Sequence, residues 1–198
     1  MTKVVDYYYT PASPWTYLGH HRFEAIAQRR GATIRYKPVD YGKIFPLSGG
    51  LPLGKRAPQR QAYRLAELKR WRDFLGVPLT IQPKYHPVAA DLAAQLIIAA
   101  ERAGAPAGPI SFELMRACWV EDRNISDAET LAAVATAQGL DGPKLVAAAR
   151  SPEIGMLYDA LTREAIDRQV FGAPFFIYKD EPFWGQDRLD FLDRALAR

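Results

Sequence analysis

The sequence predicts an α/β fold in which a βαβ unit and a ββα unit enclose a helical insertion. A Val- and Tyr-rich segment, a helix and an alternating segment fill residues 1–42, and buried-strand patterns return within residues 169–198. Between them, residues 43–168 show helical patterns from about residue 60 onward. We therefore predict two domains, one formed by both ends of the chain and one by the insertion. Because no linker separates them, we expect the insertion to pack onto the sheet as a lid.

The first unit is predicted to be a parallel βαβ unit. Residues 3–9 are rich in Val and Tyr, which favour a strand. Ser13 is a preferred N-cap, Pro14 suits the first helical position, and Gly31 ends the helix. The alternating segment 33–39 predicts a second strand, and a crossover of this kind is nearly always right-handed.

Five amphipathic, alanine-rich helices are predicted in the insertion, as in a helical bundle. They cover residues 61–76, 86–104, 111–122, 126–139 and 151–169. Ser126 and Glu129 form a capping-box pattern at the start of the fourth helix, and Ser151-Pro152 opens the fifth.

The chain is predicted to end in a ββα unit. Residues 173–178 form a buried-strand pattern, residues 179–181 a turn and residues 182–184 a short strand. A final helix over residues 185–197 places three leucines on one face, at Leu189, Leu192 and Leu196.

The composition is that of an ordinary globular protein. Of the 198 residues, 48% are hydrophobic and 24% are charged, which suits one well-formed core. The net charge is +4, and residues 53–64 come nearest to a basic block. Because no recognition motif accompanies this block, we do not expect nucleic-acid binding, and an anionic small ligand would suit it equally well.

The single cysteine narrows the possible chemistry. Cys118 alone cannot form an intrachain disulfide, a dithiol active site or a cysteine-rich zinc site, and we predict no metal site. Its helical spacing with Leu114 and Met115 favours a buried structural thiol. The N-terminus has no signal-peptide pattern and no apolar run approaches about 18 residues, so we expect a soluble cytoplasmic protein without a membrane partner.

Ser13 occupies a position of particular interest. In a redox protein of thioredoxin type, this strand-to-helix junction would carry a Cys-x-x-Cys pair, at positions that are Ser13 and Thr16 here. One interpretation is structural, a helix cap like Ser151. The other is functional: the N–H groups and partial positive charge of the helix N-terminus would favour ionisation of a ligand thiol, and the serine hydroxyl would donate to the thiolate.

Two segments near the C-terminus offer further candidate contacts. Pro174 opens a buried strand and is either cis in a loop or trans as the first residue of the strand. Free backbone groups at Ala173 would pair with an extended peptide ligand. Asp187 either caps the last helix or, together with Gln186, offers the groups that an amino-acid zwitterion needs.

Three motifs together resemble the 2-hydroxychromene-2-carboxylate isomerases, which group with the kappa-class glutathione transferases and the DsbA-like proteins. The motifs are SPWTYL at 13–18, VFGAPFF at 170–176 and FWGQDRLDFL at 183–192, and the likeness spans essentially the whole chain. The resemblance implies a thioredoxin-like fold, glutathione as the cofactor, an aromatic carboxylate as the substrate and a homodimer.

The resemblance also implies roles for particular residues. Ser13 would lie beside the sulfur of bound glutathione, in a site lined by Pro14 and Trp15. Ala173 would pair its backbone with the cysteinyl part of glutathione, with Pro174 in the cis form.

Other positions match the family less closely. Gln186 and Asp187 would hold the γ-glutamyl end of glutathione. Arg60 stands where the family has a lysine, and the two cations are not interchangeable. Gly50 stands where the family has an asparagine that helps at the active site, which leaves the substrate open.

The function implied by the resemblance is a glutathione-dependent isomerase. It would interconvert 2-hydroxychromene-2-carboxylate and trans-o-hydroxybenzylidenepyruvate, in the breakdown of naphthalene-type aromatic compounds, through transient addition of the glutathione thiolate. We expect Ser13 to stabilise this thiolate rather than attack the substrate. No base is expected to activate Ser13, because we interpret His20 and His21 as surface residues.

Several alternatives stay open at this point. Arg60, Lys43 and Lys55 are all candidate cations for the carboxylate of the substrate. A kappa-like glutathione transferase would use the same site to form a stable conjugate. A catalytically silent thiol- or peptide-binding module is the third possibility, whereas a DsbA-like oxidoreductase is excluded because positions 13 and 16 hold no cysteine.

Overall fold

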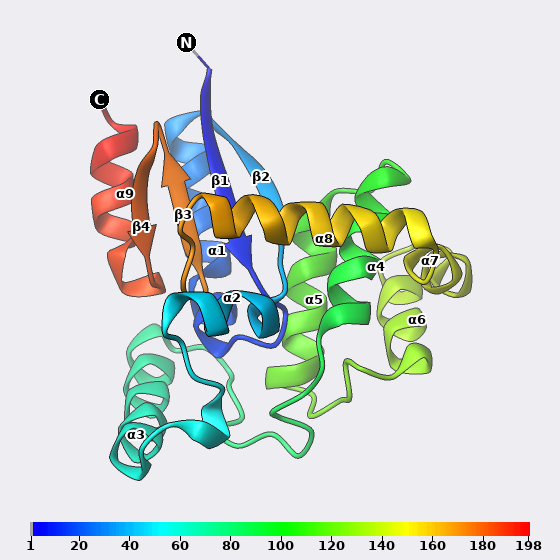
Figure 1. The fold of residues 1–198 in the computed structure, drawn as a ribbon, viewed down its shortest axis with the longest axis horizontal. Helices are drawn as coiled ribbons and strands as arrows, with labels where there is room; N and C mark the ends of the chain where they lie inside the picture. The colour runs from blue at the N-terminus through cyan, green and yellow to red at the C-terminus, as the bar shows by residue number, and fades with distance from the viewer. Residues whose placement is uncertain (1) are drawn as a thin grey trace.

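The computed structural model describes residues 2–198 and contains one mixed sheet between two layers of helices (Figure 1). The strands are β1 (Lys3–Tyr9), β2 (Ala32–Pro38), β3 (Phe175–Tyr178) and β4 (Glu181–Trp184), in the spatial order β2-β1-β3-β4. β1 runs parallel to β2 and antiparallel to β3, and β3 pairs antiparallel with β4. The predicted βαβ and ββα units are therefore confirmed.

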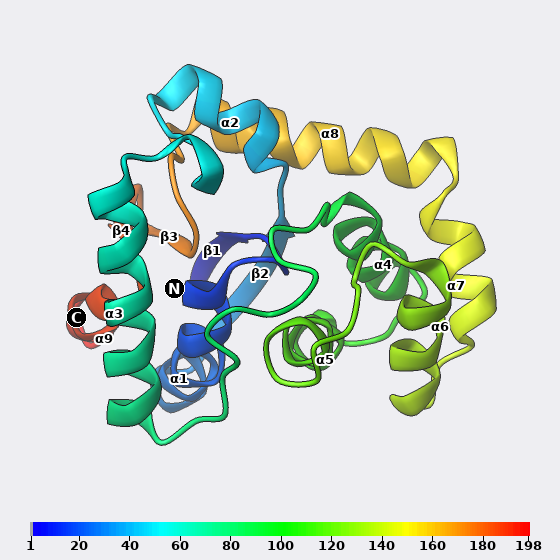
Figure 2. The same ribbon diagram turned by 90° about the horizontal axis from the view of Figure 1, so that it is seen from below.

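Helices cover both faces of the sheet and extend beyond its β2 edge (Figure 2). They are α1 (Pro14–Arg30), α2 (Tyr41–Ser48), α3 (Pro58–Leu75), α4 (Asp91–Arg102), α5 (Ala107–Trp119), α6 (Ala128–Ala137), α7 (Gly142–Ala149), α8 (Pro152–Asp167) and α9 (Leu189–Leu196), with 3-10 turns η1 (Leu53–Lys55) and η2 (Gln186–Arg188). α2 and α8 lie over one face, α1 and α9 lie under the other, and α4 to α7 lie to one side. None of the helices in residues 2–198 is long and apolar enough to span a membrane.

The strands alternate their side chains between two hydrophobic clusters, as the period of a strand requires. Tyr8 and Phe175 belong to the cluster under α2 and α8. Tyr7 and Phe176 point the other way, where their rings stack 5.1 Å apart beside Phe23 of α1. This second cluster continues without interruption into α4 to α8. The insertion therefore packs against the sheet as expected, whereas the division into two domains stays a prediction.

Two helices of the insertion were missed in the sequence analysis. Asp40 starts α2 by accepting a hydrogen bond from the N–H of Gly42, and the helix contains Pro46. A proline followed by glycines predicts a loop, but α2 is only two turns long and packs against α8. Asp141 caps α7 in the same way, through the N–H of Lys144. In both cases tertiary packing stabilises a segment whose own helix propensity is weak.

The helix boundaries also needed correction. The predicted Ser126 cap of α6 is wrong. Asp127 caps this helix by accepting a hydrogen bond from the N–H of Thr130 at 2.9 Å, whereas the hydroxyl of Ser126 donates to the side chain of Asn124. α4 begins at Asp91, five residues later than predicted, because the His86–Ala90 segment runs as a loop. The last helix is preceded by η2, although its three leucines are buried on one face as predicted.

His20 is not a surface residue. Its side chain is fully buried, with ring nitrogens 3.3 Å from the hydroxyl of Tyr7 and 3.2 Å from the carbonyl of Gly108. The physical reason is that this side of α1 packs against the start of α5, where Gly108 has no side chain to keep the two helices apart. His21, one residue further on, is exposed as expected.

Glu24 is expected to make the stability of the fold sensitive to acid. Burial raises the pKa of Glu24, but hydrogen bonds from His20, Tyr36 and His21 outweigh it and hold the pKa at about 2. The ionised carboxylate of Glu24 therefore stabilises the folded state. This contribution is complete above the ordinary carboxyl pKa and is lost as the pH falls toward 2. Between pH 7 and pH 3 we expect the wild type to lose about 1–2 kcal/mol more than Glu24→Gln in urea unfolding. Equal losses in the two proteins would contradict this.

Candidate functional site

Ser13 lies at the N-terminus of α1, just after the end of β1. Its Oγ accepts a hydrogen bond from the N–H of Thr16 at 3.2 Å, so the predicted cap is confirmed. Because Oγ acts as the acceptor in this bond, the hydroxyl hydrogen remains available, and within residues 2–198 no acceptor receives it. Ser13 is 8% exposed. The structural and functional interpretations are therefore compatible, since one hydroxyl can cap the helix and donate to a ligand.

The segment before β3 lies beside this junction. The peptide bond between Ala173 and Pro174 is cis, so the alternative of a trans-proline is wrong. The register pairs Tyr8 with Phe175, and its continuation brings Ala173 and Pro174 next to the end of β1 that leads to Ser13. Within residues 2–198 neither the N–H nor the C=O of Ala173 has a hydrogen-bond partner. Both groups are thus free to pair with an extended ligand.

η2 packs against the same helix. A side chain at Gly19 would come within 2.7 Å of Cβ of Gln186, so α1 and η2 are in close contact. The side-chain oxygen of Gln186 accepts a hydrogen bond from Arg22 at 2.6 Å. This bond positions Gln186, which is only 2% exposed, and its amide N–H groups have no partner within residues 2–198.

Asp187 has a different role from the helix cap that was considered. No side chain caps α9, so the capping alternative is wrong. The carboxylate of Asp187 is exposed and pairs with Arg188 at 2.7 Å. It therefore remains accessible to a positively charged group on a ligand.

The structure separates the candidate cations. Of the three, within residues 2–198, Lys43 alone has a carboxylate partner, Asp159 at 2.7 Å, and because both side chains are exposed this pair is weak. Lys55 and Arg60 are exposed, and neither has an ion pair within residues 2–198. Gly50 lies so close to the ring of Phe45 that any side chain at position 50 would displace it. Phe45 therefore fills the space beside the position where the family has an asparagine.

Arg64 is a charged residue that the sequence analysis missed. It lies on the inner face of α3 and is only 9% exposed. Its guanidinium carbon is 5.9 Å from the centre of the Trp119 ring. Burial, together with the charge of Arg56, lowers the pKa of Arg64 to about 10. Its spacing of four residues from the buried Leu68 was the signal that placed it on the apolar face of the helix.

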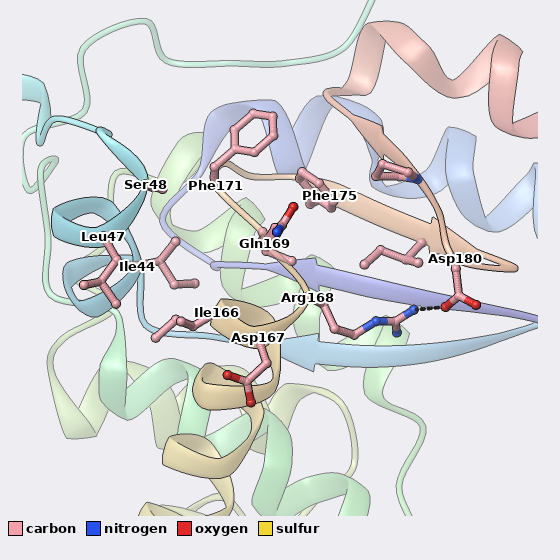
Figure 3. A pocket seen from close by; sticks show the side chains of 13 residues that line it. Ile44, Leu47, Ser48, Ile166, Asp167, Arg168, Gln169, Phe171, Phe175 and Asp180 are labelled. Carbon is pink, nitrogen blue, oxygen red and sulfur yellow. Dashed lines mark hydrogen bonds and ion pairs between the residues drawn. The ribbon is translucent and has the colours of Figure 1, made fainter.

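A cavity of about 640 Å³ lies elsewhere, between α2, the end of α8 and the β3–β4 hairpin (Figure 3). Its walls are mostly apolar, and Figure 3 shows Arg168 directed at Asp180, 3.1 Å away. None of the predicted site residues lines it. Because its arginine is already paired and none of the predicted site residues lies there, we do not place the reaction in this cavity. Among residues 2–198 no cluster of His, Cys, Asp and Glu could hold a metal ion.

Comparison with known proteins agrees with this arrangement. Residues 4–197 match the model of the DSBA-like thioredoxin domain. The chain is 30% identical to the 2-hydroxychromene-2-carboxylate isomerase of Sphingobium xenophagum, covering 99% of both chains. It is 26% identical to glutathione S-transferase kappa 1 of Caenorhabditis elegans, covering 98% of this chain and 91% of that protein.

A solved structure of a 2-hydroxychromene-2-carboxylate isomerase superposes with a TM-score of 0.86 at 28% identity, covering 98% of this chain and 95% of that chain. The predicted thioredoxin-like fold with a helical insertion is thereby confirmed. The chain therefore belongs to the DSBA-like thioredoxin-domain family and, within it, to the 2-hydroxychromene-2-carboxylate isomerase family of enzymes.

Proposed function

We propose that this enzyme is a glutathione-dependent isomerase that interconverts 2-hydroxychromene-2-carboxylate and trans-o-hydroxybenzylidenepyruvate. The observation that carries the proposal is the hydroxyl of Ser13, which caps α1 and keeps its hydrogen free beside the unpaired backbone of Ala173. The relatives named above support both the reaction and the use of glutathione.

The residues at this site fit glutathione. The free N–H and C=O of Ala173 suit the backbone of its cysteinyl residue, in the manner of an added strand. Asp187 and the amide of Gln186 suit the amino and carboxylate groups of its γ-glutamyl end. Arg60, exposed and unpaired, suits the carboxylate of its glycine. Pro14 and Trp15 lie in the first turn of α1, next to Ser13, where they would line the glutathione site.

Bound glutathione would supply a thiolate that adds reversibly to a conjugated carbon, which allows rotation about the adjoining bond. Ser13 would hold that sulfur in its ionised form by donating a hydrogen bond. The N–H groups at the start of α1 add partial positive charge at the same place. A direct attack by Ser13 is disfavoured because both ring nitrogens of His20 are engaged with Tyr7 and Gly108. Ser13 would thus act as a thiolate stabiliser.

A second candidate is a kappa-like glutathione transferase. The likeness to the Caenorhabditis elegans enzyme favours it, since the same residues would bind glutathione. The two functions differ in their product, because a transferase leaves glutathione covalently bound to its substrate and an isomerase releases it unchanged. A cytoplasmic location and a homodimer stay predictions.

Calorimetric titration with glutathione tests the proposal. We expect the wild type to bind glutathione and to show new thiolate absorbance near about 240 nm, with a weaker signal in Ser13→Ala. Glutathione should then be needed for turnover of 2-hydroxychromene-2-carboxylate and should be recovered unmodified. A conjugate in the product mixture would favour the transferase. Absence of binding at millimolar glutathione would refute both and favour a silent thiol- or peptide-binding module.

A further inference from the structure

A buried arginine without a counter-ion lies between α3 and α5. Arg64 is 9% exposed, and within residues 2–198 it has no ion pair and no hydrogen bond. A buried charge is costly to a folded protein unless a partner neutralises it. The side-chain nitrogen atoms of Arg64 have no hydrogen-bond partner, but they are not fully buried, so solvent reaches them. A ligand can therefore reach them too.

Arg64 belongs to a row of arginines, and the acidic residue one turn after it on α3, Glu67, is paired with Arg70. Arg56, Arg60 and Arg64 recur every four residues, at the start of α3 and just before it. Within residues 2–198 none of the three pairs with a carboxylate, and the one side-chain bond of this group runs from Arg56 to the carbonyl of Leu51. Three neighbouring guanidinium groups without acidic partners attract anions.

Aromatic rings line the inner side of this cluster. The ring of Trp119 lies beside Arg64, and the ring of His86 lies 4.6 Å from that of Trp119. Nε1 of Trp119 is buried and has no acceptor, so a second donor is unsatisfied at the same place. Burial and the charge of Arg64 lower the pKa of His86 to about 4, which keeps its ring uncharged at neutral pH. Aromatic faces next to free donors suit a flat aromatic anion.

Residues 78–80 link this cluster to the helix that begins at Ser13. The hydroxyl of Tyr17, one turn after Ser13, donates to the carbonyl of Pro78 at 2.8 Å. The N–H of Thr80 donates to the carbonyl of Trp119 at 2.7 Å. Residues 78–80 therefore connect the first turns of α1 to the end of α5, where the ring of Trp119 lies beside Arg64.

We propose that Arg64 is the cation that binds the carboxylate of the aromatic substrate. The guanidinium would take the carboxylate, and the half-buried ring of His86 would contact the aromatic part, while the fully buried ring of Trp119 supports both from behind. Arg60 would then be left for a carboxylate of glutathione. The naming of the substrate rests on the proposed isomerase function, whereas the preference for an aromatic carboxylate rests on the residues of the cluster alone.

Calorimetric titration of the glutathione-saturated enzyme with coumarin-3-carboxylate and with its neutral amide tests this proposal. The wild type should bind the carboxylate at least about 10-fold more tightly than the amide. Arg64→Met should abolish that preference, and Arg64→Lys should restore part of it. Arg70→Met is the matched control, because Arg70 is exposed on the same helix and paired with Glu67; it should keep the preference.

Thermal unfolding adds a readout that separates a binding role from a structural one. Because Arg64→Met removes an uncompensated charge, its Tm should rise by about 2–4 °C. An unchanged preference for the carboxylate in Arg64→Met, or equal binding of acid and amide by the wild type, would overturn the proposal. The wild type could also prefer the carboxylate through Arg64 and yet turn over no 2-hydroxychromene-2-carboxylate. This result would refute the proposed reaction and support the proposed role of Arg64 in binding the carboxylate.

Discussion

Replacing Ser13 with alanine is expected to lower the isomerase kcat about 100-fold, the usual cost of removing one hydrogen-bond donor from a developing negative charge. The serine hydroxyl is the side-chain donor that the structure places at the start of α1 with its hydrogen unused. Binding of glutathione should weaken less than turnover, because the backbone of Ala173 is unchanged. The measurement is kcat for 2-hydroxychromene-2-carboxylate at saturating glutathione.

Ser151→Ala is the matched control for this experiment. Ser151 also precedes a proline and caps a long helix, with its Oγ accepting the N–H of Ile154 at 3.3 Å. Each alanine variant should therefore lose about 1 kcal/mol of stability toward urea, the ordinary cost of a lost cap. Only Ser13→Ala should lose activity. If the two variants lose activity to the same extent, the effect of Ser13 is merely structural and the catalytic assignment is wrong.

Ser13→Cys is expected to create a highly reactive thiol. Its sulfur would lie at the N-terminus of a 17-residue helix, where partial positive charge lowers a thiol pKa to below about 7.5. The native Cys118 is buried, as predicted, and burial raises the pKa of its thiol to about 12. At pH 7 iodoacetamide should alkylate position 13 at least about 1,000-fold faster than Cys118. Thr16 supplies no second thiol and Cys118 is buried, so no disulfide should form within one chain.

The wild type and free glutathione are the controls for this variant. Under the same conditions the wild type should stay unmodified, and glutathione should react with the pKa of an ordinary thiol. The pH dependence of alkylation then reports the electrostatics of the site without any substrate. A pKa at position 13 equal to or above that of free glutathione would contradict the idea that this helix end favours a thiolate.

Local sequence patterns were sufficient for most of the fold. The Val and Tyr content of β1, the alternation of β2, the buried run of β3, the cap at Ser13 and the αL glycine at Gly31 are properties of a few adjacent residues, and all appear in the structure as predicted. α2 escaped prediction because it contains Pro46 and is followed by glycines, and α7 because it is only two turns long and begins with Gly-Pro; contacts with other helices stabilise both. The family motifs carried the identification of Ser13, Ala173 and Asp187 as candidates, which periodicity alone did not single out.

By itself, the sequence determined the order of the strands and of every helix except α2 and α7, the cap at Ser13, the lack of a dithiol and the family resemblance. Only the tertiary structure decided which charges are satisfied. Lys43 is paired with Asp159, which lies 116 residues away in the chain, and Arg64 is left buried with no such partner. The reason is physical: capping and periodicity act between near neighbours, whereas burial and ion pairing depend on atoms that only folding brings together.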